Sequence, residues 1–568
     1  MLISLRFLTG SESSSATLEF TGAIKYGGFI NRDNIDAPNL RLEWDADNNG
    51  VPDTYFLVQN PLKLRESLKK AFDNIVQRSG SGGNVIANST SVQANSLVFQ
   101  GSFNATNWSG DLAAYAVTSA GVSTNAQWKA ADTIPAEAAR RIVYRSPMDG
   151  ASRLFLRTSM NTTADWANFG STNLERRTLV SYLRGDTSGE IRNGGTLRNR
   201  SNTTVLGDIS HSSPAFVNDS GVATDPGTVF IGSNDGMLHA FNAATGVERF
   251  AYIPSAVMPT TNSTSSGIRA LAQVTYNDQH KYFVDGDIAV SARNQLNNKN
   301  YLVGTLGRGG KGMFALDVTN PDSFSPSEVL WESFGTDADM GHILGRPVIA
   351  RMENGDWAVI VGNGYNSRTV ESNSKAVLFI YELATGNLIR KIDTGEAGDN
   401  GLAPPGVFDS DNNGRIDTIY AGDLKGNVWK FNVASTTPAS WGVALSGVPM
   451  FKAVDSANKA QPITSPMSVS RNTVSGSPNA GATFIHFGTG SYFRTTDPND
   501  ASQQTLYGLI DRGVQLENQV SPTTKLLQRR VEYIGVFAGS NVRAFEKAAV
   551  NDMSGKDGFY MNLPGTGE

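Results

Sequence analysis

Carboxylate and amide side chains alternate along residues 409–417, at Asp409, Asp411, Asn413 and Asp417. Calcium is a hard cation that takes about six to eight oxygen ligands, so side-chain oxygens at alternate positions of a tight loop can surround it. Gly414 gives the loop the backbone freedom that a sharp turn requires. The glutamate of a complete EF-hand is replaced by Tyr420, so Asp417 must complete the coordination. The pattern predicts a calcium-binding loop.

The same pattern occurs a second time along residues 45–53. Its predicted ligands are Asp45, Asp47, Asn49, the backbone carbonyl of Val51 and Asp53. Pro52 lacks an N–H donor, as suits a loop that presents carbonyl groups to a cation. Both loops lead into apolar, strand-like residues, which favours a loop before a strand over a helix–loop–helix. The alternative is a metal-free cluster of turns, since Asp, Asn and Gly also dominate ordinary turns.

The elements that position these loops are mostly strands. From about residue 95 onwards, short runs of Val, Ile, Phe and Tyr alternate with Gly and Asn turns. One order of elements occurs both in 228–242 and in 418–432: a strand, a glycine, three residues, a second glycine and another strand. Looser copies give repeat markers at intervals of 57 to 72 residues, at Val229, Tyr301, Ala358, Thr418 and Phe484. This repetition predicts the four-stranded blades of a β-propeller.

The N-terminal part has a different pattern. A helix is predicted over 60–80, with Pro61 at its first position and Gly80 at its end. The Gly-, Ser- and Asn-rich run over 79–95 predicts a linker. We therefore expect a small α+β segment at 1–90, which contains the calcium-type loop at 45–53, and an all-β domain at 91–568.

Composition excludes several classes of protein. The chain has 568 residues and a net charge of −5, so it lacks the basic surface of a nucleic-acid-binding protein. No apolar stretch reaches the length of about 20 residues that a membrane helix needs. There is no cysteine, which excludes disulfides, thiol catalysis and thiolate metal sites. The histidines are isolated in sequence, which predicts core or turn residues rather than metal ligands, at His211, His239, His280, His342 and His486.

A set of longer motifs accompanies the calcium loop at 409–417. They include Leu183-Arg-Gly-Asp186, Leu206-Gly-Asp-Ile-Ser-His-Ser-Ser-Pro214, Leu344-Gly-Arg-Pro347, Val361-Gly-Asn-Gly-Tyr-Asn366 and Tyr420-Ala-Gly-Asp-Leu-Lys-Gly-Asn-Val-Trp429. With the loop at 409–417, this set resembles the C-terminal domain of the type IV pilus tip-adhesin and biogenesis family, the PilC/PilY group. The resemblance covers residues 95–568.

The resemblance implies a modified seven-bladed β-propeller with the fold of the quinoprotein dehydrogenases. It also implies a calcium-dependent role in pilus extension and retraction and in adhesion, without enzymatic activity. The implied partners are minor pilins, the pilus machinery and a host-cell receptor, with a location at the pilus tip or outer membrane. Carried over by position, the ligands are the side chains of Asp409, Asp411, Asn413 and Asp417 and the carbonyl of Arg415.

Members of this family normally carry a signal peptide and a von Willebrand A-like domain before the propeller. Neither is recognisable at the start of this chain, so residues 1–90 are expected to be the junction to such a domain, and the chain a fragment. The tripeptide Arg184-Gly185-Asp186 is of the integrin-binding type, but it lies in a segment typical of the fold, which favours a structural role.

Two alternatives remain. The repeat at 236–246 also resembles the quinoprotein alcohol dehydrogenases, which bind pyrroloquinoline quinone and calcium within a propeller. Those enzymes typically place adjacent cysteines beside the quinone, and this chain has none. The other alternative is an envelope propeller that binds calcium only for stability.

Overall fold

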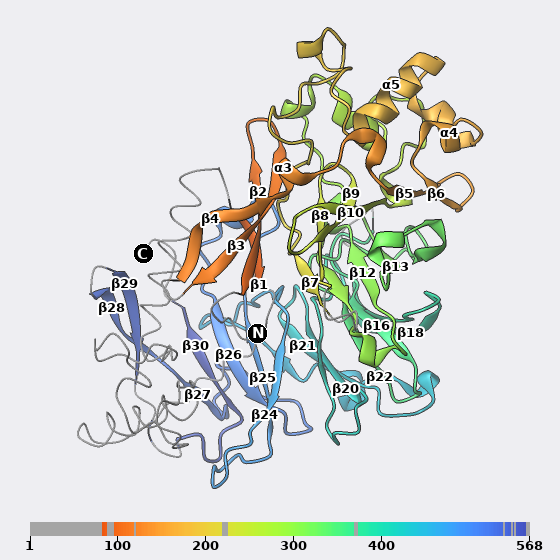
Figure 1. Cartoon of the computed structure of the whole chain (residues 1–568). Coiled ribbons are helices and arrows are strands. Elements are labelled where there is room, and N and C mark those ends of the chain that lie inside the picture. Colours follow the sequence, from red (N-terminus) through yellow and green to blue (C-terminus); the bar gives the residue numbers. More distant parts are fainter. Residues whose placement is uncertain are drawn as a thin grey trace, which may run out of the picture.

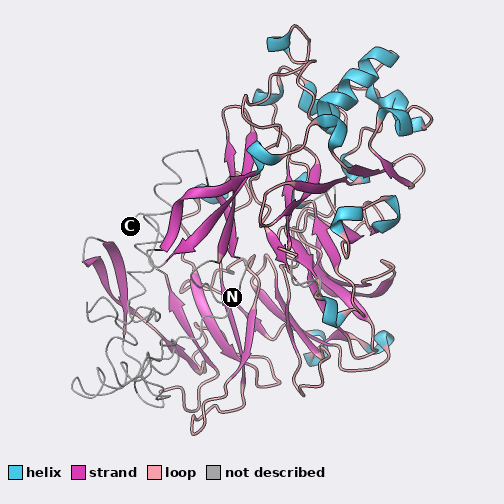
Figure 2. Cartoon of the chain, viewed as in Figure 1, coloured by secondary structure: helices cyan, strands magenta, loops and turns pink. Residues whose placement is uncertain are grey.

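Short strands dominate the computed structural model (Figures 1 and 2). It describes residues 82–87, 96–118, 121–218, 225–368, 373–537, 540–546, 549 and 552–563. The predicted loop at 45–53 and the predicted helix at 60–80 lie outside the described residues.

Six sheets of four or more strands follow one another along the chain. The first contains β1 (Gly82–Ala87), β2 (Leu97–Asn104), β3 (Ser109–Thr118) and β4 (Gly121–Lys129). The second contains β5 (Ile142–Arg145), β6 (Ser152–Leu154), β7 (Ala215–Val217), β8 (Thr228–Ser233), β9 (Met237–Asn242) and β10 (Glu248–Ile253). The third contains β11 (Ile288–Val290), β12 (Tyr301–Thr305), β13 (Met313–Asp317) and β14 (Val329–Glu332).

The next three sheets complete the series. The fourth contains β15 (Val348–Arg351), β16 (Trp357–Gly362), β17 (Lys375–Glu382) and β18 (Leu388–Ala397). The fifth contains β19 (Gly406–Phe408), β20 (Thr418–Gly422), β21 (Asn427–Asn432), β22 (Gly442–Val443) and β23 (Phe451–Lys452). The sixth contains β24 (Ser468–Arg471), β25 (Thr483–Gly488), β26 (Thr505–Ile510), β27 (Leu526–Gln528) and β30 (Gly558–Asn562). A separate two-stranded ladder is formed by β28 (Val531–Phe537) and β29 (Ser540–Phe545).

The first strand of a sheet is taken as the edge strand β1, β7, β11, β15, β19 or β24, which in the second sheet is β7 and not the earlier β5. Several of these first strands lie beside one another. Strand β7 contacts β1 and β11, β11 contacts β15, and β19 contacts β24. In the third and fourth sheets the strands pair in chain order outwards from this first strand, as do β19 to β22 of the fifth sheet, whereas in the sixth sheet β30 lies between β26 and β27. Sheets whose first strands share neighbours in this way surround a common axis, which is the arrangement of a β-propeller.

The sequence repeat corresponds to this architecture. All five repeat markers fall in the second strand of a sheet, in β8, β12, β16, β20 and β25. The glycine before the third strand has a left-handed backbone in both clear copies, with φ of +91° at Gly236 and +80° at Gly426. A side chain is strained in this conformation, so the glycines fix the tight hairpins of the two copies.

The hydrophobic core lies between neighbouring sheets. Strand β17 shows the pattern, because its side chains alternate between two core clusters. Val377 and Phe379 pack with residues of the third sheet, whereas Leu378 and Ile380 pack with residues of the fifth. A sheet that is covered on both faces has apolar central strands throughout, and the interior of β17 is buried without interruption.

The predicted all-β propeller class is confirmed. Seven sheets are present in the described part of the chain, counting the two-stranded ladder. Strand β1 falls inside the run predicted as a linker and pairs with β2, so the first sheet begins before residue 91. A run rich in Gly and Ser still holds the strand because Val85 to Ala87 pair with β2.

The α-helices in the described part of the chain are few and short. They are α3 (Ala130–Thr133), α4 (Arg157–Met160) and α5 (Asn173–Arg184). Helix α5 begins with a capping box between Thr172 and Glu175 and ends at Gly185, whose φ is +115°. None of the helices that the structure describes has the length and apolar character to span a membrane.

Candidate metal centre

The loop at 409–417 connects the first two strands of the fifth sheet. Phe408 at the end of β19 pairs with Thr418 at the start of β20, and the amide of Asp417 donates to the Phe408 carbonyl at 3.2 Å. The chain reverses between them through left-handed residues, Asn412 with φ of +60° and Gly414 with φ of +82°. The hairpin therefore closes a compact loop in which side chains at alternate positions can converge.

Three carboxylates meet in this loop. One oxygen each from Asp409, Asp411 and Asp417 lie within 4.8 Å of one another. Calcium–oxygen bonds of about 2.3–2.6 Å place two ligands on opposite sides of the ion roughly 5 Å apart, so these oxygens fit a single calcium ion. Asp417 is buried, whereas Asp411 is exposed, so the cluster is open to solvent on one side. Ions could therefore enter without unfolding of the sheet.

Backbone and hydroxyl donors hold the carboxylates in place. Asp409 accepts from the amides of Asn413 at 3.1 Å and Gly414 at 2.7 Å. Asp417 accepts from the amide and hydroxyl of Ser410 at 2.6 and 2.7 Å, and from the Thr418 hydroxyl at 2.6 Å. These donors offset part of the repulsion between like charges, and each carboxylate retains lone pairs for a cation.

Asn413 lies at the centre of a second set of contacts. Its Oδ1 accepts from the Arg415 amide at 2.7 Å, and its Nδ2 donates to Asp411 at 3.1 Å and to Glu353 Oε1 at 2.9 Å. An amide oxygen has two lone pairs, so Oδ1 can bind the Arg415 amide and a cation together. The Arg415 guanidinium donates to the Glu353 carbonyl at 2.9 Å, which ties the loop to the turn after β15.

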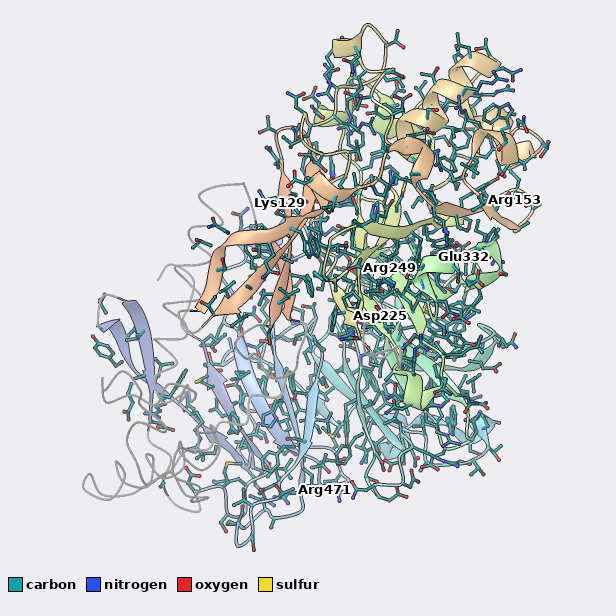
Figure 3. The ribbon with its side chains drawn as sticks, viewed as in Figure 1. Lys129, Arg153, Asp225, Arg249, Glu332 and Arg471 are labelled. Carbon is teal, nitrogen blue, oxygen red and sulfur yellow. The ribbon has the colours of Figure 1, made fainter. Side chains whose placement is uncertain are left out.

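The loop is also fixed to the sheets on both sides. On one side, the amide of Ile416 donates to the Arg351 carbonyl in the fourth sheet at 2.8 Å. On the other, the Arg471 guanidinium from β24 bonds the Ser410 carbonyl and lies over the ring of Phe408 at 5.5 Å. Figure 3 shows Arg471 at the lower end of the sixth sheet. A change in the loop would therefore reach the fourth and sixth sheets as well as the fifth.

The structure brings together the residues predicted for the loop at 409–417. Asp409, Asp411 and Asp417 form the carboxylate cluster, and Asn413 contacts Asp411. Glu353 was not among the predicted residues, because it belongs to a different sheet and no spacing rule connects it to the loop. The only sequence feature that could have drawn attention to Glu353 is its place in a polar turn beside a strand, Glu353-Asn-Gly-Asp356.

The tripeptide at 184–186 has a structural role. Arg184 is 1% exposed, and its guanidinium donates to the carbonyls of Glu137, Arg140 and Phe155. It also pairs with the Glu137 carboxylate at 3.0 Å. In this conformation the arginine is inaccessible to a receptor, in agreement with the structural role that the sequence favoured.

Three of the isolated histidines acquire carboxylate partners through the fold. His211 pairs with Asp285 at 2.7 Å, and His280 pairs with Asp208 at 2.8 Å. His239 is fully buried between Asp235 and Glu248. Burial alone lowers the pKa of His239, but the two carboxylates outweigh it and raise the pKa to about 9. Asp285 and Asp208 are more than 70 residues from their histidines and Glu248 lies on the next strand, so the sequence did not reveal these pairs. Asp235 is only four residues before His239, and this spacing was the one local signal.

Comparison with known proteins identifies the family. The family model for the PilY1 beta-propeller domain matches residues 204–531, which is more than half of the chain and includes the carboxylate cluster. The chain belongs to this family. A relative from Xylella fastidiosa, named type IV pilus biogenesis factor PilY1 homolog, is 34% identical over 84% of this chain and 37% of its own length. The type IV pilus biogenesis factor PilY1 of Pseudomonas aeruginosa is 35% identical over 87% of this chain and 46% of its own length.

Two solved structures are similar to parts of this chain. The crystal structure of the Pseudomonas aeruginosa PilY1 C-terminal domain is 32% identical, with a TM-score of 0.47 over 60% of this chain and 71% of that chain. A quinohemoprotein alcohol dehydrogenase from Comamonas testosteroni is 12% identical, with a TM-score of 0.30 over 63% of this chain and 47% of that chain. The chain spans less than half of the length of the two curated PilY1 relatives.

Proposed function

We propose that this chain is the propeller part of a calcium-binding type IV pilus biogenesis factor. The supporting observation is the family match over 204–531, because it encloses the cluster of Asp409, Asp411 and Asp417. Minor pilins and the pilus machinery are the partners, and the protein acts at the pilus tip or cell surface. It acts in assembly and adhesion, not as an enzyme.

In this proposal calcium occupancy at 409–417 controls how the propeller engages the pilus machinery during extension and retraction. The ligands are the side chains of Asp409, Asp411, Asn413 and Asp417 and the carbonyl of Arg415. The fixed contacts of the loop with Arg351 and Arg471 provide a route from the ion to two neighbouring sheets. Without the ion, the three carboxylates repel one another and the loop loosens locally.

The decisive experiment uses Asp417→Ala and Asp417→Lys in the full-length protein of the source bacterium. Asp417→Ala removes a ligand, and Asp417→Lys places a cation in the cluster. We expect altered surface piliation and twitching motility for the alanine variant, and restoration towards wild-type levels by lysine. Wild-type piliation and motility in both variants, with loss of calcium binding confirmed by calorimetry, would leave calcium a purely structural role.

A second calcium ion is proposed at 45–53, bound by Asp45, Asp47, Asn49, the carbonyl of Val51 and Asp53. Its test is stoichiometry. Calorimetry should give two calcium ions for the wild-type chain and one for Asp47→Ala. Equal stoichiometry in the two proteins would eliminate this site.

The quinone-enzyme alternative has weaker support. A reconstituted chain that shows a quinone absorbance band and oxidises alcohols with an artificial electron acceptor would establish it. The absence of cysteine and the names of the relatives both favour the pilus role.

A further inference from the structure

A cavity of about 230 Å³ lies where the segments before several first strands converge. Four of its lining residues come three or four positions before the first strand of their sheets: His211, Asp285, Leu344 and Thr464. Because the first strands surround the propeller axis, equivalent positions in different sheets meet at one end of that axis. The volume corresponds to roughly eight water molecules at about 30 Å³ each. A single sugar ring could take their place.

Aromatic side chains form one side of the cavity. Tyr492 is 76% exposed, although large apolar surfaces are normally covered. Its neighbour Phe493 stacks on Tyr365, with ring centroids 4.4 Å apart and planes inclined by 20°. The stacked pair and the exposed Tyr492 ring offer flat apolar faces to a ligand.

Negatively and positively charged side chains complete the lining. The Asp285 side chain is 1% exposed and pairs with His211, whose side chain is 44% exposed. Asp285 also accepts from Asn234 at 3.2 Å and from the His211 amide at 3.3 Å, so this buried carboxylate holds the His211 ring at the cavity wall. Arg308 lies over the ring of Tyr282 at 5.7 Å and brings five N–H donors.

Tyr365 lies beneath the aromatic wall. It lines the cavity and is 4% exposed, and its hydroxyl is buried without a hydrogen-bond partner among the described residues. A ligand in the cavity therefore meets the ring of Tyr365, not its hydroxyl.

We propose that this axial cavity binds a neutral saccharide. A sugar ring has an apolar C–H face for Tyr492 and Phe493, and hydroxyl groups that both bond the exposed ring of His211 and accept from Arg308. The opposite charges of Asp285 and Arg308 balance, so the lining favours neither an anion nor a cation. None of the lining residues belongs to the carboxylate cluster at 409–417, so this site is independent of the proposed calcium function.

The test uses the whole chain with glucose, galactose, mannose, N-acetylglucosamine and their disaccharides as probes. Saturation-transfer NMR at millimolar ligand identifies the sugars that bind, and titration gives their affinities. Tyr492→Ala removes the exposed ring, and Arg308→Gln removes the charged donor. Each should weaken binding by about tenfold, which is the loss of one good contact in a small site.

Tyr533→Ala is the matched control, because Tyr533 is a 50% exposed tyrosine on β28 and does not line the cavity. It should leave the affinity within about twofold of wild type. Thermal unfolding checks that each variant is folded, and chelation of calcium should leave saccharide binding unchanged. The proposal is overturned if no probe binds, if both cavity variants bind as the control does, or if phosphate or citrate binds in place of the sugars.

Discussion

At the scale of single residues, the proposed calcium site depends on how the loop holds its carboxylates. Five hydrogen bonds from backbone and hydroxyl donors keep Asp409 and Asp417 facing one another. A preorganised set of ligands loses little conformational entropy when the ion binds. The bidentate glutamate of an EF-hand is missing, which reduces the number of oxygens that the loop supplies. We therefore expect a dissociation constant of roughly 1–100 μM, weaker than that of cytosolic calcium buffers.

The first prediction concerns individual ligands. Asp411→Ala and Asp417→Ala should each abolish calcium binding at this loop, since each removes one of three carboxylates. Arg415→Ala is the control within the loop, and it should change the affinity little because the backbone carbonyl remains. Isothermal titration calorimetry measures all three. Tight binding by Asp417→Ala would refute the assignment of ligands.

The second prediction concerns Glu353, which positions a ligand without belonging to the loop. Its Oε1 can bond only the nitrogen of the Asn413 amide, so it fixes the direction in which the amide faces. Residues that orient metal ligands typically contribute about 10-fold or more to affinity. Glu353→Ala should therefore weaken calcium binding by about tenfold, whereas Glu353→Gln keeps the acceptor oxygen and should bind like wild type. Equal affinities for alanine and glutamine would exclude the positioning role.

At the scale of elements, the second sheet contains a buried charge network. Arg140 forms two hydrogen bonds of 2.7 Å with Glu248, and Glu248 also contacts His239. Burial raises the pKa of Glu248, but Arg140 and His239 outweigh it and lower the pKa to about 2. The network joins β9, β10 and the segment before β5. Removing one partner from such a buried network is strongly destabilising, because an uncompensated charge remains.

This network predicts an alkaline loss of stability. The pKa of His239 rises from its ordinary 6.5 to about 9 in the folded chain, so folding favours the protonated form. The stabilisation is fully present below pH 6.5 and is lost as the pH rises through about 9. Its upper bound is on the order of 3 kcal/mol.

Chemical denaturation between pH 6 and pH 10 measures this loss. His239→Gln should be less stable than wild type at pH 7 and should show a smaller decline towards pH 10. His486→Gln is the control, because burial lowers the pKa of His486, so this residue does not titrate at alkaline pH. The same alkaline decline in His239→Gln and wild type would assign it to other groups.

The repeat, the strands and the metal loop could be predicted from the sequence because their signals are local. Hairpin glycines, apolar runs and alternating Asp residues all lie within a few positions of one another. The contacts of Glu353 with Asn413 and of His211 with Asp285 join residues 60 and 74 positions apart. Such pairs depend on how sheets are placed around the axis, which spacing alone does not give. The axial cavity was not predicted from the sequence either. A proline directly precedes β7, β15 and β19, and it marks the equivalent position in three sheets, close to the residues that line the cavity.

At the scale of the whole molecule, the sheets are stabilised by apolar packing on both faces, independently of calcium. Core clusters connect the second sheet with the third, the third with the fourth and the fourth with the fifth. Calcium that binds only the folded loop adds about 2.7 kcal/mol at a hundredfold excess over the dissociation constant. This stabilisation is small compared with that of the apolar cores. The propeller should therefore persist without the ion, and the response to calcium should be local.

The last prediction follows the response across the sheets by hydrogen exchange. Removal of calcium with a chelator should speed amide exchange in 409–418, because the carboxylates repel one another without the ion. The amide of Ile416 is bonded to Arg351, and Ser410 is bonded by Arg471, so the change should extend to the turn at 352–356 and to β24. Strands β8 and β9 in the second sheet are the internal control and should exchange at the same rate in both states. Faster exchange throughout the chain would make calcium a requirement for the fold. Faster exchange in the loop alone would remove the route by which the ion could act on neighbouring sheets.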